Sequence, residues 1–123
     1  MPKAALEPLA RLTNATRYSL NGWRAAWRTQ PALRYESYGL LPIVPLAWHF
    51  GANNVERALL IGSWLLVIIV ELINSAIESI VDRIGSERNE LSGRAKDLGS
   101  AAVLGSIVLA ATVWSIVAFR WFG

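Results

Sequence analysis

The feature that most constrains this chain is an uncharged apolar run near its C-terminal end. Residues 98–119 contain no Asp, Glu, Lys or Arg. A helix of that length crosses the hydrocarbon core of a bilayer, which is roughly 30 Å thick. The first half of the run is rich in Gly, Ala and Ser, which suits close contact with another helix. Because hydrophobic residues make up 54% of the chain, we expect a membrane protein.

Two further apolar segments precede this run. Residues 58–81 are predicted to form a second span, apolar in its first half and increasingly polar in its second half. Residues 37–52 form a weaker span that contains Pro42 and Pro45, and we expect a kink there. The sequence therefore predicts an all-α membrane protein, a single domain over residues 1–123 with three transmembrane helices.

An amphipathic surface helix is predicted over residues 6–28. Leu9, Leu20, Trp23 and Trp27 fall near one line on such a helix, together with Thr16. Three arginines lie to one side of this line and Arg11 lies opposite it. Tryptophan side chains suit the headgroup region of a bilayer, so the helix would lie on the membrane surface. The pattern alone leaves open whether this helix is only an anchor or also contributes to a site.

Ten of the twelve basic residues fall in two blocks, one before residue 35 and one within residues 82–97, while Arg57 and Arg120 lie outside them. By the positive-inside rule, both blocks face the cytoplasm. Their position beside apolar runs explains the basic balance without a nucleic-acid partner. The absence of cysteine excludes disulfides and thiolate chemistry.

Smaller signals mark the ends of the predicted helices. Asn53 and Asn54 are expected to make the turn between the first two spans. Ser92 is expected to cap the third transmembrane helix. His49, the one histidine, is interpreted as an interfacial residue at the outer end of the first span.

A polar stripe runs along the second half of the 58–81 span. At helical spacing, Glu71, Asn74, Ser75, Glu78 and Asp82 lie on one face. A carboxylate in the hydrocarbon region costs about 2.5–3.5 kcal/mol on insertion scales, so it needs a partner, a cation or a wet cavity. The plainer alternative is that Asn74 and Ser75 form hydrogen bonds between helices, while the carboxylates of Glu78 and Asp82 only reach the membrane interface.

Two classes of function fit such a stripe. A proton-coupled carrier uses intramembrane carboxylates as relays, and a lipid-modifying enzyme uses them as a general base and a metal ligand. The polar groups gather at the cytoplasmic end and few reach the outer side, which favours an enzyme with a phosphorylated co-substrate. The sequence contains no P-loop and no Rossmann glycine motif.

Residues 71–104, ELINSAIESIVDRIGSERNELSGRAKDLGSAAVL, resemble the signature of the bacterial integral-membrane diacylglycerol kinases. Residues 18–27, YSLNGWRAAW, resemble the surface helix of that family, and the two blocks fit without gaps. Undecaprenol kinases share much of the signature and are the alternative. The resemblance implies a homotrimer in the bacterial inner membrane, with active sites between neighbouring subunits. It also implies transfer of the ATP γ-phosphoryl group to diacylglycerol, giving phosphatidic acid.

The resemblance further implies roles for individual residues. Glu71 would be the general base, Asn74 would organise the site, and Glu78 would bind Mg²⁺, which prefers hard oxygen ligands. The implied ATP contacts are Arg11, Tyr18, Gln30, Glu78, Glu87, Arg88, Asn89, Lys96 and Asp97. The implied lipid contacts are Arg24, Ala25, Ala26, Trp27, Glu36, Glu71, Asn74 and Ser100.

Gln30 departs from the family pattern. Better-known members have a glutamate at this position, where it shares the metal with the residue equivalent to Glu78. Gln30 offers a carbonyl oxygen without a charge. We therefore expect that Gln30 and Glu78 hold the metal more weakly here, or that Glu78 and the ATP phosphates do most of the holding. Arg88 and Asn89 also differ from the residue types typical of the family's loop.

Overall fold

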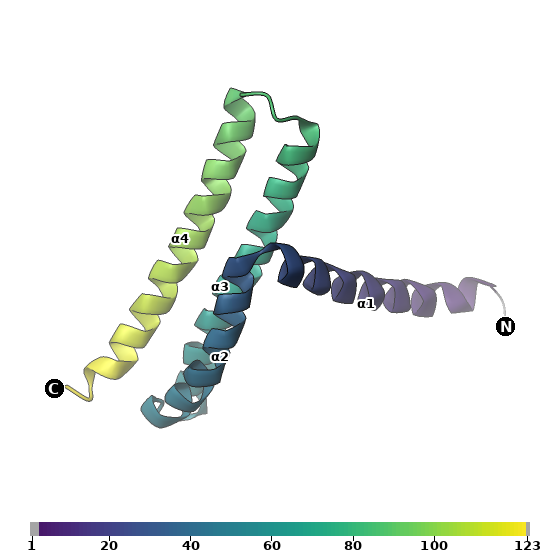
Figure 1. Ribbon diagram of the computed structural model, residues 1–123. Helices are drawn as coiled ribbons and strands as arrows, with labels where there is room; N and C mark the ends of the chain where they lie inside the picture. The colour runs from purple at the N-terminus through teal and green to yellow at the C-terminus, as the bar shows by residue number, and fades with distance from the viewer. Residues whose placement is uncertain (1–2, 123) are drawn as a thin grey trace. The chain divides into compact units, whose positions relative to one another are not determined.

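The computed structural model describes residues 3–122, with side chains from residue 7 onward, as four helices. They are α1 (Lys3–Thr29), α2 (Pro31–Phe50), α3 (Asn54–Ile84) and α4 (Glu90–Phe119) (Figure 1). The described part of the chain contains no strand, which confirms the all-α prediction. The chain divides into two compact units between Pro31 and Ala32. Helix α1 lies in the first unit, and α3 and α4 lie in the second together with nearly all of α2.

Helix α1 covers residues 6–28, which were predicted to be helical, and begins a few residues earlier. Its apolar side chains Leu9, Leu20 and Trp23 are exposed. Serine and threonine hydroxyls along the helix bond back to carbonyls four residues earlier, as Thr16 does to the Leu12 carbonyl at 3.0 Å. These polar groups are therefore satisfied within the helix, and its apolar side is left uncovered.

Helices α3 and α4 are long and apolar enough to cross a membrane. They contain 31 and 30 residues, so each is about 45 Å long at about 1.5 Å per residue. This exceeds the hydrocarbon thickness. Helix α3 extends beyond the predicted span 58–81 at both ends, and α4 begins before the predicted span 98–119 and ends with it. Among the described helices, α2 does not reach the same hydropathy. It runs through Pro42 and Pro45 as one continuous helix.

The α3–α4 hairpin is the framework of the second unit. The two helices pack side by side and are joined by a short connection at the top of Figure 1. Asn53 caps α3, since its side chain accepts a hydrogen bond from the Glu56 amide at 2.9 Å. Asn89 caps α4 and accepts from the Leu91 and Ser92 amides. The predicted Ser92 cap is wrong because α4 begins earlier, and Asn89 supplies the oxygen for its free amides.

The three helices of this unit meet at the end opposite the α3–α4 connection. Ala47, Leu60 and Val117, one from each helix, form a buried apolar cluster. The indole N–H of Trp114 donates to the Leu60 carbonyl at 3.1 Å. His49 stacks on Trp121, with ring centroids 5.2 Å apart.

The Arg120 guanidinium links the three helices at the same end. Arg120 donates to both carboxylate oxygens of Glu56, at 2.8 and 2.6 Å, and to the Phe50 carbonyl at 2.5 Å. Glu56 precedes the predicted 58–81 span. The hydrogen bonds from Arg120 lower the pKa of Glu56 from 4.5 to about 2. We name Phe50, Glu56, Arg120 and Trp121 the end clamp, because these residues tie all three helices together.

Candidate active site

The polar stripe of α3 faces the interior of the second unit. Glu71, Asn74 and Ser75 are buried, Glu78 is half-buried and Asp82 is exposed. Burial therefore falls steadily toward the α3–α4 connection. The burial of the first three residues agrees with the prediction that these polar side chains share one face of the helix.

The deep end of the stripe is fixed by contacts with α4. The Asn74 amide nitrogen donates to Oε1 of Glu78 at 3.3 Å, while Oδ1 of Asn74 is buried and has no hydrogen-bond partner among the described residues. Gly99 of α4 lies directly against this oxygen, and a Cβ added at Gly99 would collide with it. Only a residue without a side chain allows α4 to approach Asn74 so closely.

A further carboxylate comes from α2. Glu36 is half-buried, and its Oε2 is buried with no hydrogen-bond partner among the described side chains and backbone. Glu36 repels Glu71 electrostatically, and Glu71 repels Glu78 in the same way. Each of these two pairs of carboxylates therefore lies within electrostatic reach. In the described part of the chain, no three His, Cys, Asp or Glu residues form a ready metal cluster.

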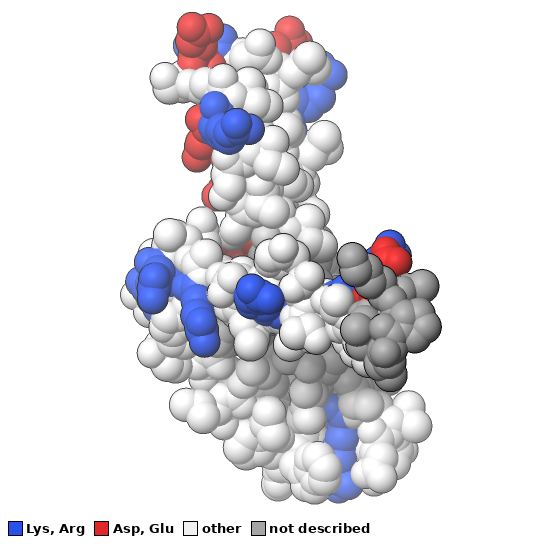
Figure 2. All heavy atoms as spheres, turned by 90° about the vertical axis from the view of Figure 1, so that its right-hand side faces the viewer, with Lys and Arg blue, Asp and Glu red and all other residues white. Residues whose placement is uncertain are grey.

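The exposed end of the stripe carries an ion pair that the sequence analysis did not anticipate. Nζ of Lys96 lies 2.7 Å from Oδ1 of Asp82. The hydrogen bond to Asp82 raises the pKa of Lys96 above its ordinary value of 10.5. Lys96 is also attracted by Glu78, so it lies within electrostatic reach of the stripe. Figure 2 shows side chains of both charge signs at this end of the hairpin.

The other predicted residues of the second unit are exposed around this end. Glu87, Arg88 and Asn89 lie in the α3–α4 connection, and Asp97 and Ser100 lie on α4. The Asn89 side-chain oxygen already caps α4, so its role in the structure is local.

The remaining predicted residues belong to the first unit and are described within it. Arg11 forms an exposed ion pair with Glu7, with a distance of 2.5 Å, and Tyr18 is exposed. Gln30 follows the last residue of α1, and its backbone N–H donates to the Ala26 carbonyl at 2.8 Å. The predicted lipid contacts of this unit are the α1 residues Arg24, Ala25, Ala26 and Trp27.

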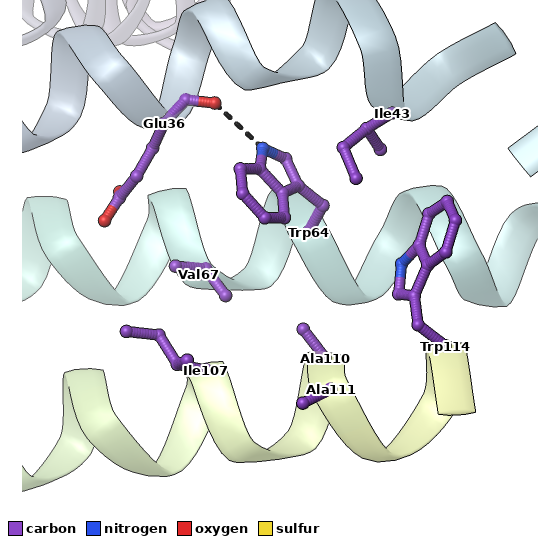
Figure 3. Close-up of a pocket in the computed structure, with 8 residues that line it drawn as sticks. All are labelled: Glu36, Ile43, Trp64, Val67, Ile107, Ala110, Ala111 and Trp114. Atoms are coloured by element: carbon purple, nitrogen blue, oxygen red, sulfur yellow. Dashed lines mark hydrogen bonds between the residues drawn. The ribbon is translucent and has the colours of Figure 1, made fainter. Parts of the chain in front are cut away.

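An apolar cavity of about 320 Å³ lies between α2, α3 and α4. Its lining residues are Glu36, Ile43, Trp64, Val67, Ile107, Ala110, Ala111 and Trp114 (Figure 3). Glu36 is the only charged residue of this lining. The sequence analysis assigned no role to Trp64, whose one signal was its position two helical turns before Glu71 on the same face.

Comparison with known proteins places this geometry in context. A family model for prokaryotic diacylglycerol kinase matches residues 17–118. A diacylglycerol kinase from Escherichia coli strain K12 is 50% identical over 113 residues, which cover 92% of this chain and 93% of that protein. One from Haemophilus influenzae is 45% identical, covering 90% and 94%. One from Pseudomonas aeruginosa is 43% identical, covering 89% of each.

Proposed function

The chain belongs to the prokaryotic diacylglycerol kinase family, and from this membership we propose that it transfers the γ-phosphoryl group of ATP to the hydroxyl of diacylglycerol. The products are phosphatidic acid and ADP. The observation that carries the proposal is the Glu71 carboxylate, which is buried in a helix able to span a membrane. An ionisable side chain inside a membrane segment is costly and marks a functional site.

Glu71 acts as the general base in this proposal. Its carboxylate accepts the proton of the lipid hydroxyl while the hydroxyl oxygen forms a bond to the γ-phosphorus. The bond between that phosphorus and the β–γ bridging oxygen breaks, and ADP leaves with the electron pair. Asn74 lies one turn from Glu71, and its hydrogen bond to Glu78 links successive turns of the stripe.

The donor atoms near Glu78 fit a magnesium ion. Mg²⁺ is usually held by one or two carboxylates together with substrate phosphates, so a cluster of three acidic residues is not needed. Glu78 supplies a carboxylate, and the neighbouring Oδ1 of Asn74 is an oxygen without a partner among the described residues. We assign the metal to Glu78 and to the side-chain carbonyl of Gln30. When bound, the ion neutralises charge on the ATP phosphates.

The nucleotide is assigned to the exposed end of the stripe. Lys96 supplies a positive charge for the phosphates. In the structure, its ammonium group lies 2.7 Å from the Asp82 carboxylate. The further ATP contacts that we propose are Arg11, Tyr18, Glu87, Arg88, Asn89 and Asp97. A charged, water-soluble co-substrate fits this end because burial of the stripe decreases toward it.

The lipid is assigned to the deep end of the stripe. There Glu36 and Glu71 bring two carboxylates together beside an apolar cavity. The further lipid contacts that we propose are Arg24, Ala25, Ala26, Trp27, Asn74 and Ser100. The acceptor hydroxyl would then meet ATP between the buried and the exposed parts of the same helix face.

The membrane arrangement that supports this chemistry has three spans. We propose that α2 crosses the membrane with α3 and α4, that residues 1–123 form one kinase domain, and that α1 lies on the surface of the bacterial inner membrane. The basic N-terminal block and the 82–97 segment then face the cytoplasm, where ATP is available.

A homotrimer is the assembly that we propose. Helix α4 leaves large apolar side chains exposed, with Leu104 63%, Val108 56% and Ile116 70% accessible. The small residues at the start of α4 suit close helix contact between subunits. Neighbouring subunits would then enclose the stripe, which one hairpin covers only in part.

A phosphoryl-transfer assay tests this function. The purified protein in mixed micelles should move labelled phosphate from ATP to diacylglycerol, and Glu71→Gln should lower the rate by about 100-fold or more. The trimer should persist in the variant. A wild-type protein that phosphorylates undecaprenol and leaves diacylglycerol unchanged would reassign the acceptor. Proton-driven flux without phosphoryl transfer would refute the kinase proposal.

A further inference from the structure

Trp64 joins α2 to α3 next to the carboxylates. It is the only aromatic residue of α3. Its indole N–H donates to the main-chain carbonyl of Glu36 at 2.8 Å, as the dashed line in Figure 3 shows. The hydrogen bond therefore holds the backbone of α2 at the residue whose side chain supplies the carboxylate of that helix.

The same indole also fills a notch in α2. At Gly39, one turn after Glu36, an added Cβ would lie 2.5 Å from Cζ2 of Trp64. A side chain at this position would push the two helices apart or displace the ring. The hydrogen bond and the glycine contact lie three residues apart along α2, and together they oppose both sliding and rotation of α2 on α3.

This register matters because Glu36 has to face Glu71. Oε2 of Glu36 is buried without a hydrogen-bond partner among the described residues, and the two carboxylates are close enough to repel one another. A shift of α2 by one residue would turn the Glu36 side chain by about 100° and move it about 1.5 Å along the helix axis. Either movement would take its carboxylate away from the stripe.

We propose that Trp64 is a positioning residue for the lipid acceptor: by fixing α2 on α3 through Glu36 and Gly39, it keeps the Glu36 carboxylate beside Glu71. This inference rests on the proposed function, in which the acceptor lies between these carboxylates. ATP is assigned to the opposite, exposed end of the stripe. Disturbing Trp64 should therefore change how the lipid is bound and leave ATP binding unchanged.

The chain offers a matched pair of variants for the test. Trp64→Phe keeps an aromatic ring and removes the indole N–H. Trp114→Phe makes the same chemical change at another residue of the same cavity, where the lost hydrogen bond goes to Leu60. We expect Trp64→Phe to raise KM for diacylglycerol about fivefold, which corresponds to one lost hydrogen bond. KM for ATP should stay at the wild-type value in both variants, and KM for diacylglycerol should stay there in Trp114→Phe.

Gly39→Ala tests the contact from the other helix, with the indole N–H left in place. It should also raise KM for diacylglycerol and leave KM for ATP unchanged. Because Phe lacks the Cζ2 atom of the indole, Gly39→Ala should do less harm in a Trp64→Phe background, so the two effects should not add. If Trp64→Phe does not give a folded trimer, the kinetics of Gly39→Ala decide the question.

Several outcomes would overturn the inference. One is an equal loss of activity in Trp64→Phe and Trp114→Phe, which would indicate a general packing effect. Another is a rise in KM for ATP that matches the rise for diacylglycerol. A third is wild-type kinetics in both Trp64→Phe and Gly39→Ala. An inactive wild-type protein would instead refute the proposed function, so the two failures are distinguishable.

Discussion

Replacing Gly99 with alanine should disturb the site through a single methyl group. In the structure, Gly99 of α4 lies against the side-chain oxygen of Asn74, and a Cβ there would collide with that oxygen. The Asn74 side chain is buried, and its nitrogen is engaged with Glu78. The amide therefore has little room to turn away, and the helices must separate or the hydrogen bond to Glu78 must break.

Two opposing effects set the size of the change in stability. Forcing an extra methyl group into a packed contact costs about 1–3 kcal/mol. Alanine in place of glycine inside a helix stabilises it by about 1 kcal/mol. The net loss in the free energy of unfolding for Gly99→Ala is then about 0–2 kcal/mol. Gly105→Ala on the same helix has nothing within 4 Å of its added Cβ, so it should gain about 1 kcal/mol.

The comparison of the two variants isolates the contact. Thermal unfolding in the same micelles should place Gly105→Ala above wild type and Gly99→Ala below Gly105→Ala by about 1–3 kcal/mol. Turnover should fall in Gly99→Ala alone, because only that variant displaces Asn74. Adding Asn74→Ala should restore the stability of Gly99→Ala without restoring its turnover. Equal stability and equal turnover of the two glycine variants would refute the packing argument.

The remaining predictions concern the metal, the nucleotide and the end clamp. Gln30→Glu should lower the Mg²⁺ concentration for half-maximal turnover, since it adds a carboxylate; an unchanged Mg²⁺ titration would remove Gln30 from the metal site. Lys96→Met should raise KM for ATP about tenfold through loss of a charged contact, whereas Asp82→Asn, which frees the ammonium, should raise it less. The pKa of Glu56 is lowered to about 2 from 4.5, so its bond to Arg120 stabilises the fold above pH 4.5, and this contribution is lost as the pH falls toward 2. Melting temperatures measured across that range should converge for wild type and Glu56→Gln at the acid end.

The helices and the polar face of α3 could be predicted because both depend on local periodicity. An uncharged run and a 3.6-residue repeat are properties of single segments. The same repeat places Glu71 and Asp82 on one face, and Asp82 is exposed because it lies near the end of α3. The start of α4 could not be predicted in this way. Ser92 and Asn89 are both residue types that cap helices, and the local sequence does not decide between them.

The contacts between helices lay beyond the sequence analysis for a different reason. The fit of Gly99 to Asn74 and of Gly39 to Trp64 depends on the relative placement of segments that are more than 20 residues apart. A glycine in an apolar helix indicates that some neighbour approaches closely, and it does not identify that neighbour. The pairing of Lys96 with Asp82 likewise needs the folded hairpin.

The end clamp has a consequence for the biosynthesis of the protein. In the proposed topology, Arg57 and Arg120 lie on the outer side, against the usual bias of positive charge toward the cytoplasm. Arg57 bonds to Asn54 and lies over the ring of Trp48, and Arg120 bonds to Glu56. Glu56 precedes Arg120 along the chain, so the acidic acceptor is synthesised before the guanidinium that binds it. In the proposed topology, the ion pair with Glu56 would hold this cation on the outer side and so stabilise the inserted position of α4.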